Sequence, residues 1–283
     1  MSKLSDIGLT ALAPAIWGST YIVTTQLLPP GMPLTVAALR ALPAGLLLLG
    51  IVRRLPQGEW WWKSLLLGAL NFTLFWACLF VSAYRLPGGV AATVGAVQPL
   101  IVILIARLVI GTPIRPIVVL AGLAGMAGVA LLVLTPKAAL DPIGIAAGLA
   151  GAVSMAFGTV LSRHWQAPVS PLTFTAWQLT AGGVLLAPLA LFLEPSLPPL
   201  SVQNWIGFLY LGLIGAALTY ILWFRGLRLL EPAAASVLGF LSPLVAVLLG
   251  WIILGQSLSL LQMLGVLVVL ASVWVSQRSA MRR

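Results

Sequence analysis

The sequence has few charged residues. Only 7% of its 283 residues are Asp, Glu, Lys or Arg, whereas 61% are hydrophobic and the mean hydropathy is +1.11. An ordinary soluble domain has about 25% charged residues. The charged residues of this chain are therefore too few to cover the surface of a sizeable soluble domain. The composition therefore predicts an integral membrane protein, with the lipid bilayer as its main surroundings.

Cysteine, histidine and acidic residues are also scarce. The single cysteine, Cys78, lies in an apolar run and can form no disulfide within the chain. One histidine and five acidic residues provide no set for metal binding or acid–base catalysis inside the bilayer, so we expect no metal, no cofactor and no catalytic residue. The formal net charge of +10 comes from Lys and Arg at the ends of apolar runs. Such placement is typical of membrane orientation signals and does not indicate nucleic-acid binding.

Ten apolar segments are separated by Gly, Pro and charged residues. Each is about as long as a helix that crosses the hydrocarbon layer, and none alternates like a barrel strand. We therefore predict an all-α integral membrane protein with ten transmembrane helices, at residues 7–28, 33–52, 63–83, 88–110, 114–134, 143–161, 172–193, 204–225, 232–254 and 260–276.

The basic residues predict the orientation of these helices. With the amino terminus in the cytoplasm, most of them fall on the cytoplasmic side, as the positive-inside rule requires. Only Arg85 and Lys137 fall outside, and Arg40 lies within the second segment. We therefore expect both termini to be cytoplasmic. The residues on the cytoplasmic side are Lys3, Arg53, Arg54, Lys63, Arg107, Arg115, Arg163, Arg225, Arg228, Arg278, Arg282 and Arg283.

The two halves of the chain resemble each other. A shift of 144 residues places residues 86–100 over residues 230–244, so that Gly95 and Pro99 recur as Gly239 and Pro243. We predict two repeats, residues 1–138 and 139–283, each with five helices. Because five is odd, the second repeat must enter the membrane from the opposite side. Such inverted repeats commonly place a substrate site at their interface, although a duplication that serves stability alone is the alternative.

Several motifs resemble the EamA-type members of the drug/metabolite transporter superfamily. These are Trp17-Gly18-Ser19-Thr20, Pro33, Arg40, and paired Pro-Leu motifs followed by Gly111 and Gly255. The resemblance covers nearly the whole chain and is strongest to the aromatic amino-acid exporters. It implies two inverted five-helix repeats and export of small metabolites, amino acids especially, across the bacterial inner membrane. Many relatives carry Gly-Glu where this chain has Thr112 and Gln256 after the glycines, so no role for those carboxylates applies here.

Aromatic and polar side chains inside the apolar segments are the candidates for substrate binding. Pro14, Trp17 and Tyr21 fall on one side of the first segment at helical spacing. Asn71 and Phe75 share a stripe of the third segment, with Trp76 beside it. Each of these residues has packing between helices as its alternative role.

The second half repeats this pattern. Thr219, Tyr220 and Trp223 correspond to the stripe around Phe75 under the 144-residue shift, and Phe157 corresponds to Trp17 under a shift of 140. We expect these residues to form an aromatic wall built from both repeats.

Two polar residues precede prolines in corresponding segments, as Gln98-Pro99 and Ser242-Pro243. A proline inside a helix frees a backbone carbonyl one turn earlier. Gln98 and Ser242 are therefore candidates for substrate binding, and Pro14, Pro99 and Pro243 for helix kinks or gating. A plain packing kink is the alternative.

Tryptophans near segment ends are typical interfacial anchors. Trp223 belongs to this group and would then serve as both anchor and gate. The group consists of Trp60, Trp61, Trp62, Trp165, Trp205, Trp223, Trp251 and Trp274.

The acidic residues Asp6, Glu59, Asp141, Glu194 and Glu231 all map to segment ends or loops. Because proton-driven transporters usually titrate a carboxylate or histidine within the membrane, we predict facilitated transport of a substrate without net charge. Arg40 has three possible roles: it binds a carboxylate, it pairs with a helix carboxyl end, or it snorkels outward.

Two other functions are the alternatives. A drug or toxic-cation exporter would favour a buried carboxylate, and a membrane-embedded enzyme would need buried acids, histidines or a metal. The sequence supplies neither set. One chain suffices for a transport path, and the sequence leaves the oligomeric state open.

Overall fold

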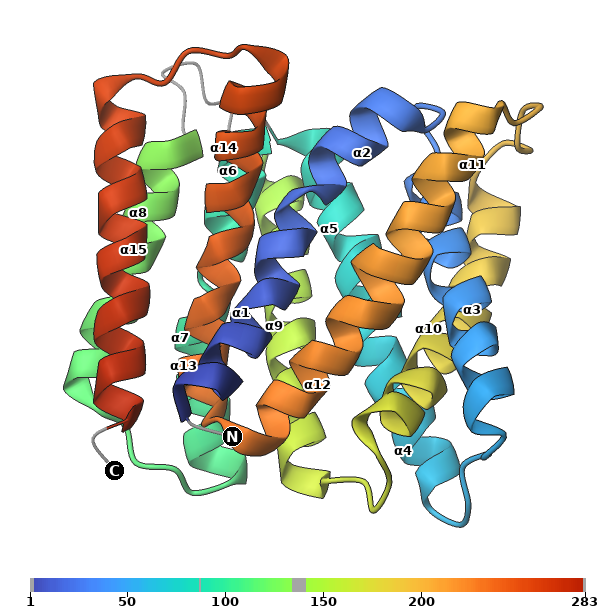
Figure 1. Cartoon of the computed structure of the whole chain (residues 1–283), viewed down its shortest axis with the longest axis horizontal. Helices are drawn as coiled ribbons and strands as arrows, with labels where there is room; N and C mark the ends of the chain where they lie inside the picture. Colours follow the sequence, from blue (N-terminus) through green and yellow to red (C-terminus); the bar gives the residue numbers. More distant parts are fainter. Residues whose placement is uncertain (1–2, 87, 134–140, 282–283) are drawn as a thin grey trace.

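The computed structural model describes residues 3–86, 88–133 and 141–281, which are helical with short connections and contain no strand (Figure 1). In this part of the chain, ten helices are long and apolar enough to cross a membrane. The predicted fold class is thus confirmed. Lys137, Arg282 and Arg283 lie outside the described residues, as does the expected repeat boundary at residues 138–139.

The ten membrane-spanning helices are numbered here as spans 1 to 10. The first five are α1 (Lys3–Gly18) with α2 (Thr20–Leu27); α3 (Pro33–Val52); α4 (Trp60–Gly68), η1 (Ala69–Thr73) and α5 (Leu74–Arg85); α6 (Gly88–Gly95) with α7 (Gln98–Val109); and α8 (Pro116–Val133). The last five are α9 (Pro142–Trp165); α10 (Pro171–Leu193); α11 (Val202–Leu209), η2 (Tyr210–Leu218) and α12 (Thr219–Leu229); α13 (Pro232–Val237), η3 (Leu238–Phe240) and α14 (Leu241–Leu254); and α15 (Leu260–Met281).

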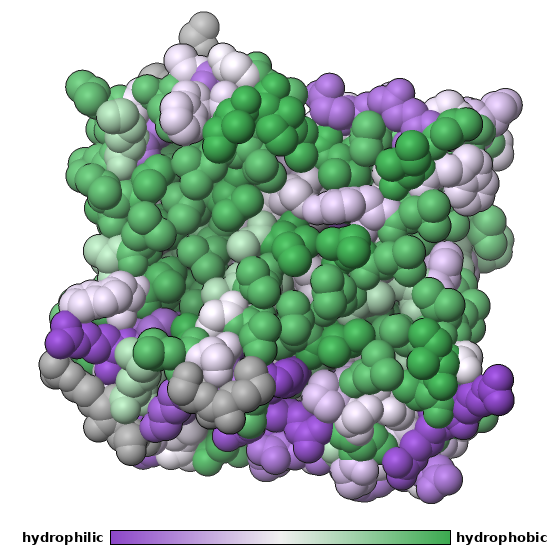
Figure 2. Space-filling model, viewed as in Figure 1, coloured by the Kyte–Doolittle hydropathy of each residue, from purple (hydrophilic) through white to green (hydrophobic). Residues whose placement is uncertain are grey.

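Most spans begin and end within a few residues of the predicted segments. The clearest differences are at span ends: span 1 begins at Lys3, and spans 6, 8 and 10 end at Trp165, Leu229 and Met281. Helical hydrogen bonding continues there into the polar interface, which an apolar segment does not reveal. Figure 2 shows the result as a broad hydrophobic band, with hydrophilic residues gathered along its two edges.

The two halves run in opposite directions. In Figure 1, α1 rises from the edge at which α15 ends, whereas α9, the first span of the second half, descends toward that edge. Both ends of the described chain therefore lie on the same side of the molecule. This is the arrangement expected of two inverted five-helix repeats.

The contacts between spans repeat this two-fold relation. Span 2 packs on span 7, and span 5 packs on span 10. In each pair, the two spans are the corresponding members of the two repeats. Span 1 contacts spans 8 and 9, and span 6 correspondingly contacts spans 3 and 4. The repeats therefore interlock along their whole length and do not form two separate bundles.

Corresponding spans share the same irregularities. Span 4 is interrupted at residues 96–97, before Pro99, and span 9 is interrupted by the 3₁₀ turn η3, before Pro243. Each break lies in the turn that precedes the proline. A proline removes a helical hydrogen bond and disfavours the helical conformation of the residue before it. Pro14, by contrast, lies inside the continuous helix α1, and span 1 is interrupted only at Ser19.

Spans 3 and 8 both contain a π-helical segment. The 144-residue shift places η1 inside η2, at residues 213–217. A π-helical turn contains an additional residue and alters the backbone hydrogen bonds around it, and such turns often occur at functional sites.

Spans 4 and 9 also end alike. Gly111 and Gly255 both adopt left-handed backbone, with φ of 77° and 63°, which glycine adopts without a steric penalty.

One of the tryptophan predictions is wrong. Trp61, Trp62, Trp205, Trp251 and Trp274 are about half exposed, as interfacial anchors would be. Trp223 is only 2% exposed and packs inside the bundle. Its place near the end of the apolar segment was misleading, because α12 continues for another six residues to Leu229.

Candidate functional site

An aromatic cluster from both repeats lies inside the bundle. The Trp17 ring is 4.9 Å from that of Tyr220 and 5.3 Å from that of Trp223, measured between ring centroids. Phe72 lies 4.6 Å from Tyr220 and 5.3 Å from Trp76. Rings at these separations and tilts attract one another beyond their burial. Spans 1 and 3 of the first repeat and span 8 of the second thus share one cluster, with four of the predicted residues in it.

A chain of hydrogen bonds fixes this cluster to the π-helical segment η2. The Trp17 indole donates to the Thr219 hydroxyl at 2.9 Å, and that hydroxyl donates to the carbonyl oxygen of Gly215 at 2.8 Å. The same carbonyl accepts from the Arg40 guanidinium at 2.5 Å. Gly215 lies near the middle of span 8, so spans 1, 2 and 8 meet at one backbone carbonyl.

Arg40 is therefore neither at a helix end nor snorkelling. Its residue is 8% exposed, and the guanidinium carbon lies 5.2 Å from the centre of the Trp76 ring. Its Nε atom is buried and has no hydrogen-bond partner among the described residues. The alternatives of outward snorkelling and of pairing with a helix carboxyl end are both wrong, because the guanidinium is held by the interior of span 8.

In the second repeat, the residue that corresponds to Arg40 has no charge. Under the repeat shifts Arg40 corresponds to Gln178, and Gly215 corresponds to Asn71. The Asn71 amide donates to the Gln178 carbonyl oxygen at 2.7 Å and approaches Ser162 at 3.4 Å. Asn71 is thus occupied in joining spans 3, 6 and 7, although its Oδ1 atom lacks a partner among the described residues.

The interrupted spans provide open space. A Cβ atom added at Gly95 or at Gly239 would meet no atom within 4 Å, although both glycines lie inside membrane spans. Gln98 and Ser242, the predicted polar residues next to the prolines, are half-buried at the start of α7 and α14. Ser242 contributes its carbonyl oxygen to the close contact with Gly18, the neighbour of Trp17.

Three predicted residues lie outside the aromatic cluster. Tyr21 is 57% exposed in α2, and Phe157 is 38% exposed on α9. Phe75 is half-buried against the main hydrophobic core. None of the three takes part in a ring pair among the described residues.

All five acidic residues lie at span ends and have partners there. Asp6, Glu59, Asp141 and Glu231 pair with Arg225, Lys63, Arg85 and Arg115, respectively. Glu194, at the end of α10, accepts from the backbone N–H groups of Leu34 and Thr35 at 2.6 and 2.7 Å. It thereby caps the amino end of α3, where an acidic group is favourable.

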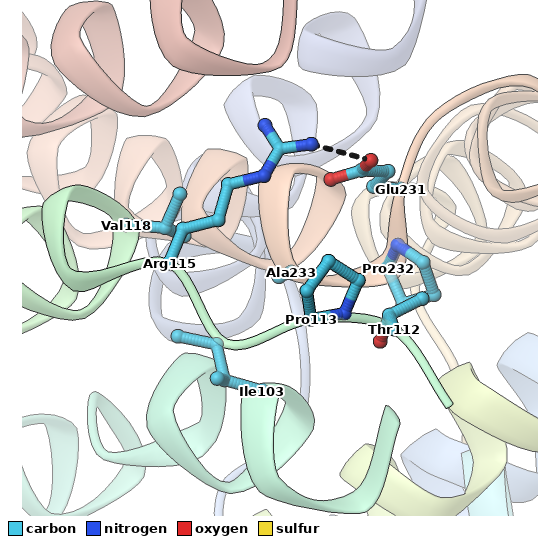
Figure 3. Close-up of a pocket in the computed structure, with 8 residues that line it drawn as sticks. All are labelled: Ile103, Thr112, Pro113, Arg115, Val118, Glu231, Pro232 and Ala233. Carbon is cyan, nitrogen blue, oxygen red and sulfur yellow. Dashed lines mark hydrogen bonds and ion pairs between the residues drawn. The ribbon is translucent and has the colours of Figure 1, made fainter. Parts of the chain in front are cut away.

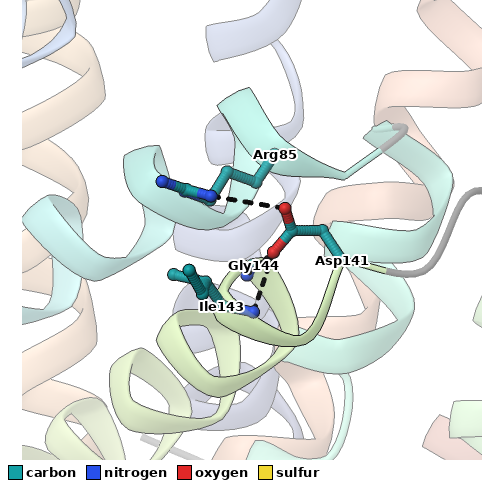
Figure 4. A network of polar contacts seen from close by, with 4 residues as sticks. All are labelled: Arg85, Asp141, Ile143 and Gly144. Carbon is teal, nitrogen blue, oxygen red and sulfur yellow. Dashed lines mark hydrogen bonds and ion pairs between the residues drawn. The ribbon is translucent and has the colours of Figure 1, made fainter.

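Ion pairs join helices at both edges of the bundle. At one edge Arg225 of α12 is 2.5 Å from Asp6 of α1, and Arg115 is 3.0 Å from Glu231. Figure 3 shows the latter two side chains meeting over a pocket of about 20 Å³, room for about one water molecule. At the opposite edge Arg85 of α5 is 3.3 Å from Asp141, the residue just before α9 (Figure 4).

Asp141 also caps α9. Its Oδ1 atom accepts from the backbone N–H groups of Ile143 and Gly144 at 2.8 and 2.9 Å (Figure 4). The hydrogen bond from Gly144, with those from Ile143 and Arg85, lowers the pKa of Asp141 below its ordinary value, although partial desolvation opposes them. These contacts favour the ionised carboxylate.

An apolar groove of about 200 Å³ lies between α3 and the α11–η2 part of span 8. Leu47, Trp205 and Leu209 line it and are about half exposed.

Sequence reasoning missed three members of the site. Phe72, Phe174 and Phe224 extend the aromatic cluster, with Phe224 lying 5.3 Å from Phe174 and 5.7 Å from Tyr220. Phe72 is four residues before Trp76, a helical spacing that could have indicated it. Phe174 is four residues before Gln178, a spacing that could have indicated it.

The chain is similar to known membrane transporters. The model of the EamA-like transporter family matches it twice, at residues 5–134 and 142–277. Protein PecM of Dickeya dadantii is 45% identical over 97% of this chain and 92% of its own length. The uncharacterized inner membrane transporter YedA of Escherichia coli K12 is 30% identical over 91% of this chain and 86% of its own length.

A solved crystal structure has the same fold. Its TM-score to this chain is 0.84 over the full length of both, at 22% sequence identity. The similarity supports the fold and no finer property. Since the family model covers both halves of the chain and the relatives align over nearly its whole length, this protein is a multi-pass membrane protein of the EamA-like transporter family.

Proposed function

We propose that this transporter exports small metabolites, most of all amino acids including aromatic ones, across a bacterial inner membrane. The aromatic cluster around Trp17, Tyr220 and Trp223 carries the proposal, because it places stacking surfaces from both repeats inside the membrane. An indole or phenyl side chain would gain about 0.5 to 1.5 kcal/mol from each aromatic pair, beyond its burial.

The proposed mechanism is alternating access. The two repeats contribute equivalent interrupted spans, with open space at Gly95 and Gly239, and inverted repeats commonly rock against each other around a site at their interface. The ion pairs Arg85–Asp141 and Arg225–Asp6 join corresponding helices at opposite edges of the bundle. One pair would open while the other stays closed.

Transport is proposed to be facilitated, without proton coupling through an intramembrane carboxylate. The support is that all five acidic residues are paired or capping at span ends. A substrate without net charge then moves down its own gradient.

The location and orientation are proposals as well. YedA is named as an inner membrane transporter, and we extend that location to this chain. The edge that holds Lys3 and Met281 also holds most of the described basic residues, which favours a cytoplasmic position for both termini.

The alternatives have less support. A cationic drug would meet the buried guanidinium of Arg40 beside the cluster, which disfavours it electrostatically. Membership in a transporter family argues against a membrane-embedded enzyme.

Uptake of labelled tryptophan, phenylalanine and threonine into liposomes that contain the purified protein tests the proposal. We expect uptake without an imposed pH gradient, and a several-fold lower rate for tryptophan with Trp17→Ala. Trp274→Ala, which removes an exposed tryptophan of α15, is the matched control and should keep the wild-type rate. Uptake that occurs only with a pH gradient would contradict facilitated transport, and no uptake of any of the three would contradict the amino-acid assignment.

A further inference from the structure

Arg40 is a buried cation without a counter-ion among the described residues. Each of the five carboxylates has another partner at a span end. The guanidinium contacts the Gly215 carbonyl and the Trp76 ring, and the hydroxyls of Tyr210 and Tyr220 also interact with its charge. An arginine side chain stays protonated even when buried. A charge inside the bilayer is unfavourable unless it is paired, and such a charge commonly marks a substrate path.

The contacts of the guanidinium are also incomplete. Arg40 Nε is buried and unpartnered among the described residues, and only one strong hydrogen bond, to the Gly215 carbonyl, holds the group. A guanidinium has five N–H donors in a planar fork that matches a carboxylate in two parallel hydrogen bonds. A carboxylate would therefore supply both the missing charge and the missing acceptor.

The position of Arg40 relative to the cluster suits a particular ligand. Trp76 lies against the guanidinium, Phe72 against Trp76, and Tyr220 against Phe72, so the cation is at one end of a continuous row of rings. The equivalent residue in the other repeat, Gln178, is neutral and already bonded to Asn71. The two halves of the site thus differ in charge although their backbones correspond.

We propose that Arg40 is the subsite for the carboxylate group of the transported molecule, whose apolar or aromatic part contacts the rings. In the described conformation the Gly215 carbonyl occupies this subsite, and the ligand carboxylate replaces it. Binding then releases the carbonyl of the π-helical segment η2 and the hydrogen-bond chain to Thr219 and Trp17. The proposal rests on the proposed function, since it assigns one chemical group of that substrate to one residue.

A series of ligands that differ only in charged groups tests the subsite. Binding of phenylalanine, 3-phenylpropionate, phenylalaninamide and phenethylamine to the purified protein would be measured by quenching of tryptophan fluorescence. For the wild type we expect both carboxylates to bind about tenfold or more tightly than the two ligands without one. This ratio corresponds to one charge-assisted hydrogen bond.

The variants separate binding from structure. Arg40→Gln introduces the residue type that the second repeat has at the corresponding position, Gln178. This variant should lose the preference for carboxylates, whereas its binding of phenethylamine should be equal or tighter. Arg40→Lys keeps the charge and should retain part of the preference. Arg278→Gln is the matched control, because Arg278 also lies over a tryptophan, 4.9 Å from the Trp274 ring centre, but at the end of α15.

The possible results separate a substrate-binding role of Arg40 from a structural one. An equal loss of all four ligands in Arg40→Gln would show a structural role and overturn the proposal, as would an unchanged preference or a wild type that binds neither carboxylate. If phenylalanine is not transported but 3-phenylpropionate binding depends on Arg40, the amino-acid assignment fails and the carboxylate subsite stands. If phenylalanine is transported equally well by Arg40→Gln, the subsite fails and the proposed function stands.

Discussion

The Thr219 hydroxyl is the polar centre of the aromatic cluster. It accepts from the Trp17 indole and donates to the Gly215 carbonyl, so one side chain fixes the angle between spans 1 and 8. Within a membrane a polar side chain has no water as an alternative partner, although hydrogen bonds between helices contribute only about 0.6 kcal/mol on average. The bond should therefore affect ring position more than stability.

Trp17→Phe tests that contribution. The variant keeps an aromatic ring but loses the indole N–H, and we expect the free energy of unfolding to fall by about 0.5 to 1.5 kcal/mol. Unfolding in detergent would be measured for Trp17→Phe, Thr219→Val and the double variant. If the single effects simply add, the two side chains are not coupled and the hydrogen bond does not matter.

Asp141 predicts a dependence of stability on pH. Its pKa is lowered in the folded protein, so its stabilising contribution is complete above the ordinary pKa of Asp, ~3.9, and disappears as the pH falls through the lower folded value. We expect Asp141→Asn to lower the thermal midpoint at pH 7 and to reduce its decline between pH 5 and pH 3. Identical pH profiles for the two proteins would refute this assignment.

At the scale of the elements, glycine allows close contact between spans. A Cβ atom added at Gly183 on α10 would lie 2.6 Å from the Cα atom of Leu42 on α3. Spans 2 and 7 touch backbone to backbone there, which small residues permit in membranes.

Gly183→Ala should therefore separate α3 from α10. We expect it to destabilise the protein by about 1 to 3 kcal/mol, as overpacking does in tight cores. Gly8→Ala is the matched control, because a Cβ atom at Gly8 would meet nothing within 4 Å, and it should leave stability unchanged or slightly higher. Equal thermal midpoints for the two variants would contradict the close contact.

The sequence was sufficient to predict the spans but only some of the backbone irregularities inside them. Apolar length gave the ten helices, because lipid requires every span to be helical. The breaks in spans 4 and 9 could be predicted from Pro99 and Pro243. The π-helical segments could not, since η1 and η2 contain no proline; in the structure they contact α10 and α3, respectively.

For the same reason the site was predicted only in part. Trp17, Trp76, Tyr220 and Trp223 meet as members of one cluster, and Phe72 joins them by lying between the rings of Trp76 and Tyr220. The burial of Arg40 depends on a carbonyl 175 residues away in the chain. No local pattern could indicate that contact.

At the scale of the whole molecule, the two repeats form one transporter with a pseudo-two-fold relation. Gly95 and Gly239 correspond to each other and lie in the two interrupted spans, Gly95 at the end of α6 and Gly239 just after α13. In Figure 1, α6 and α13 lie toward opposite edges of the bundle. If the repeats rock against each other, water should reach these two positions alternately and from opposite sides of the membrane.

The most direct test is labelling of single cysteines at these positions. Gly95→Cys and Gly239→Cys, each combined with Cys78→Ala, would be treated in oriented vesicles with a membrane-impermeant thiol reagent from either side. With alternating access, each cysteine should be labelled from a different side, and a transported substrate should change both rates. Labelling of both positions from the same side only, or of neither, would contradict alternating access between the two repeats.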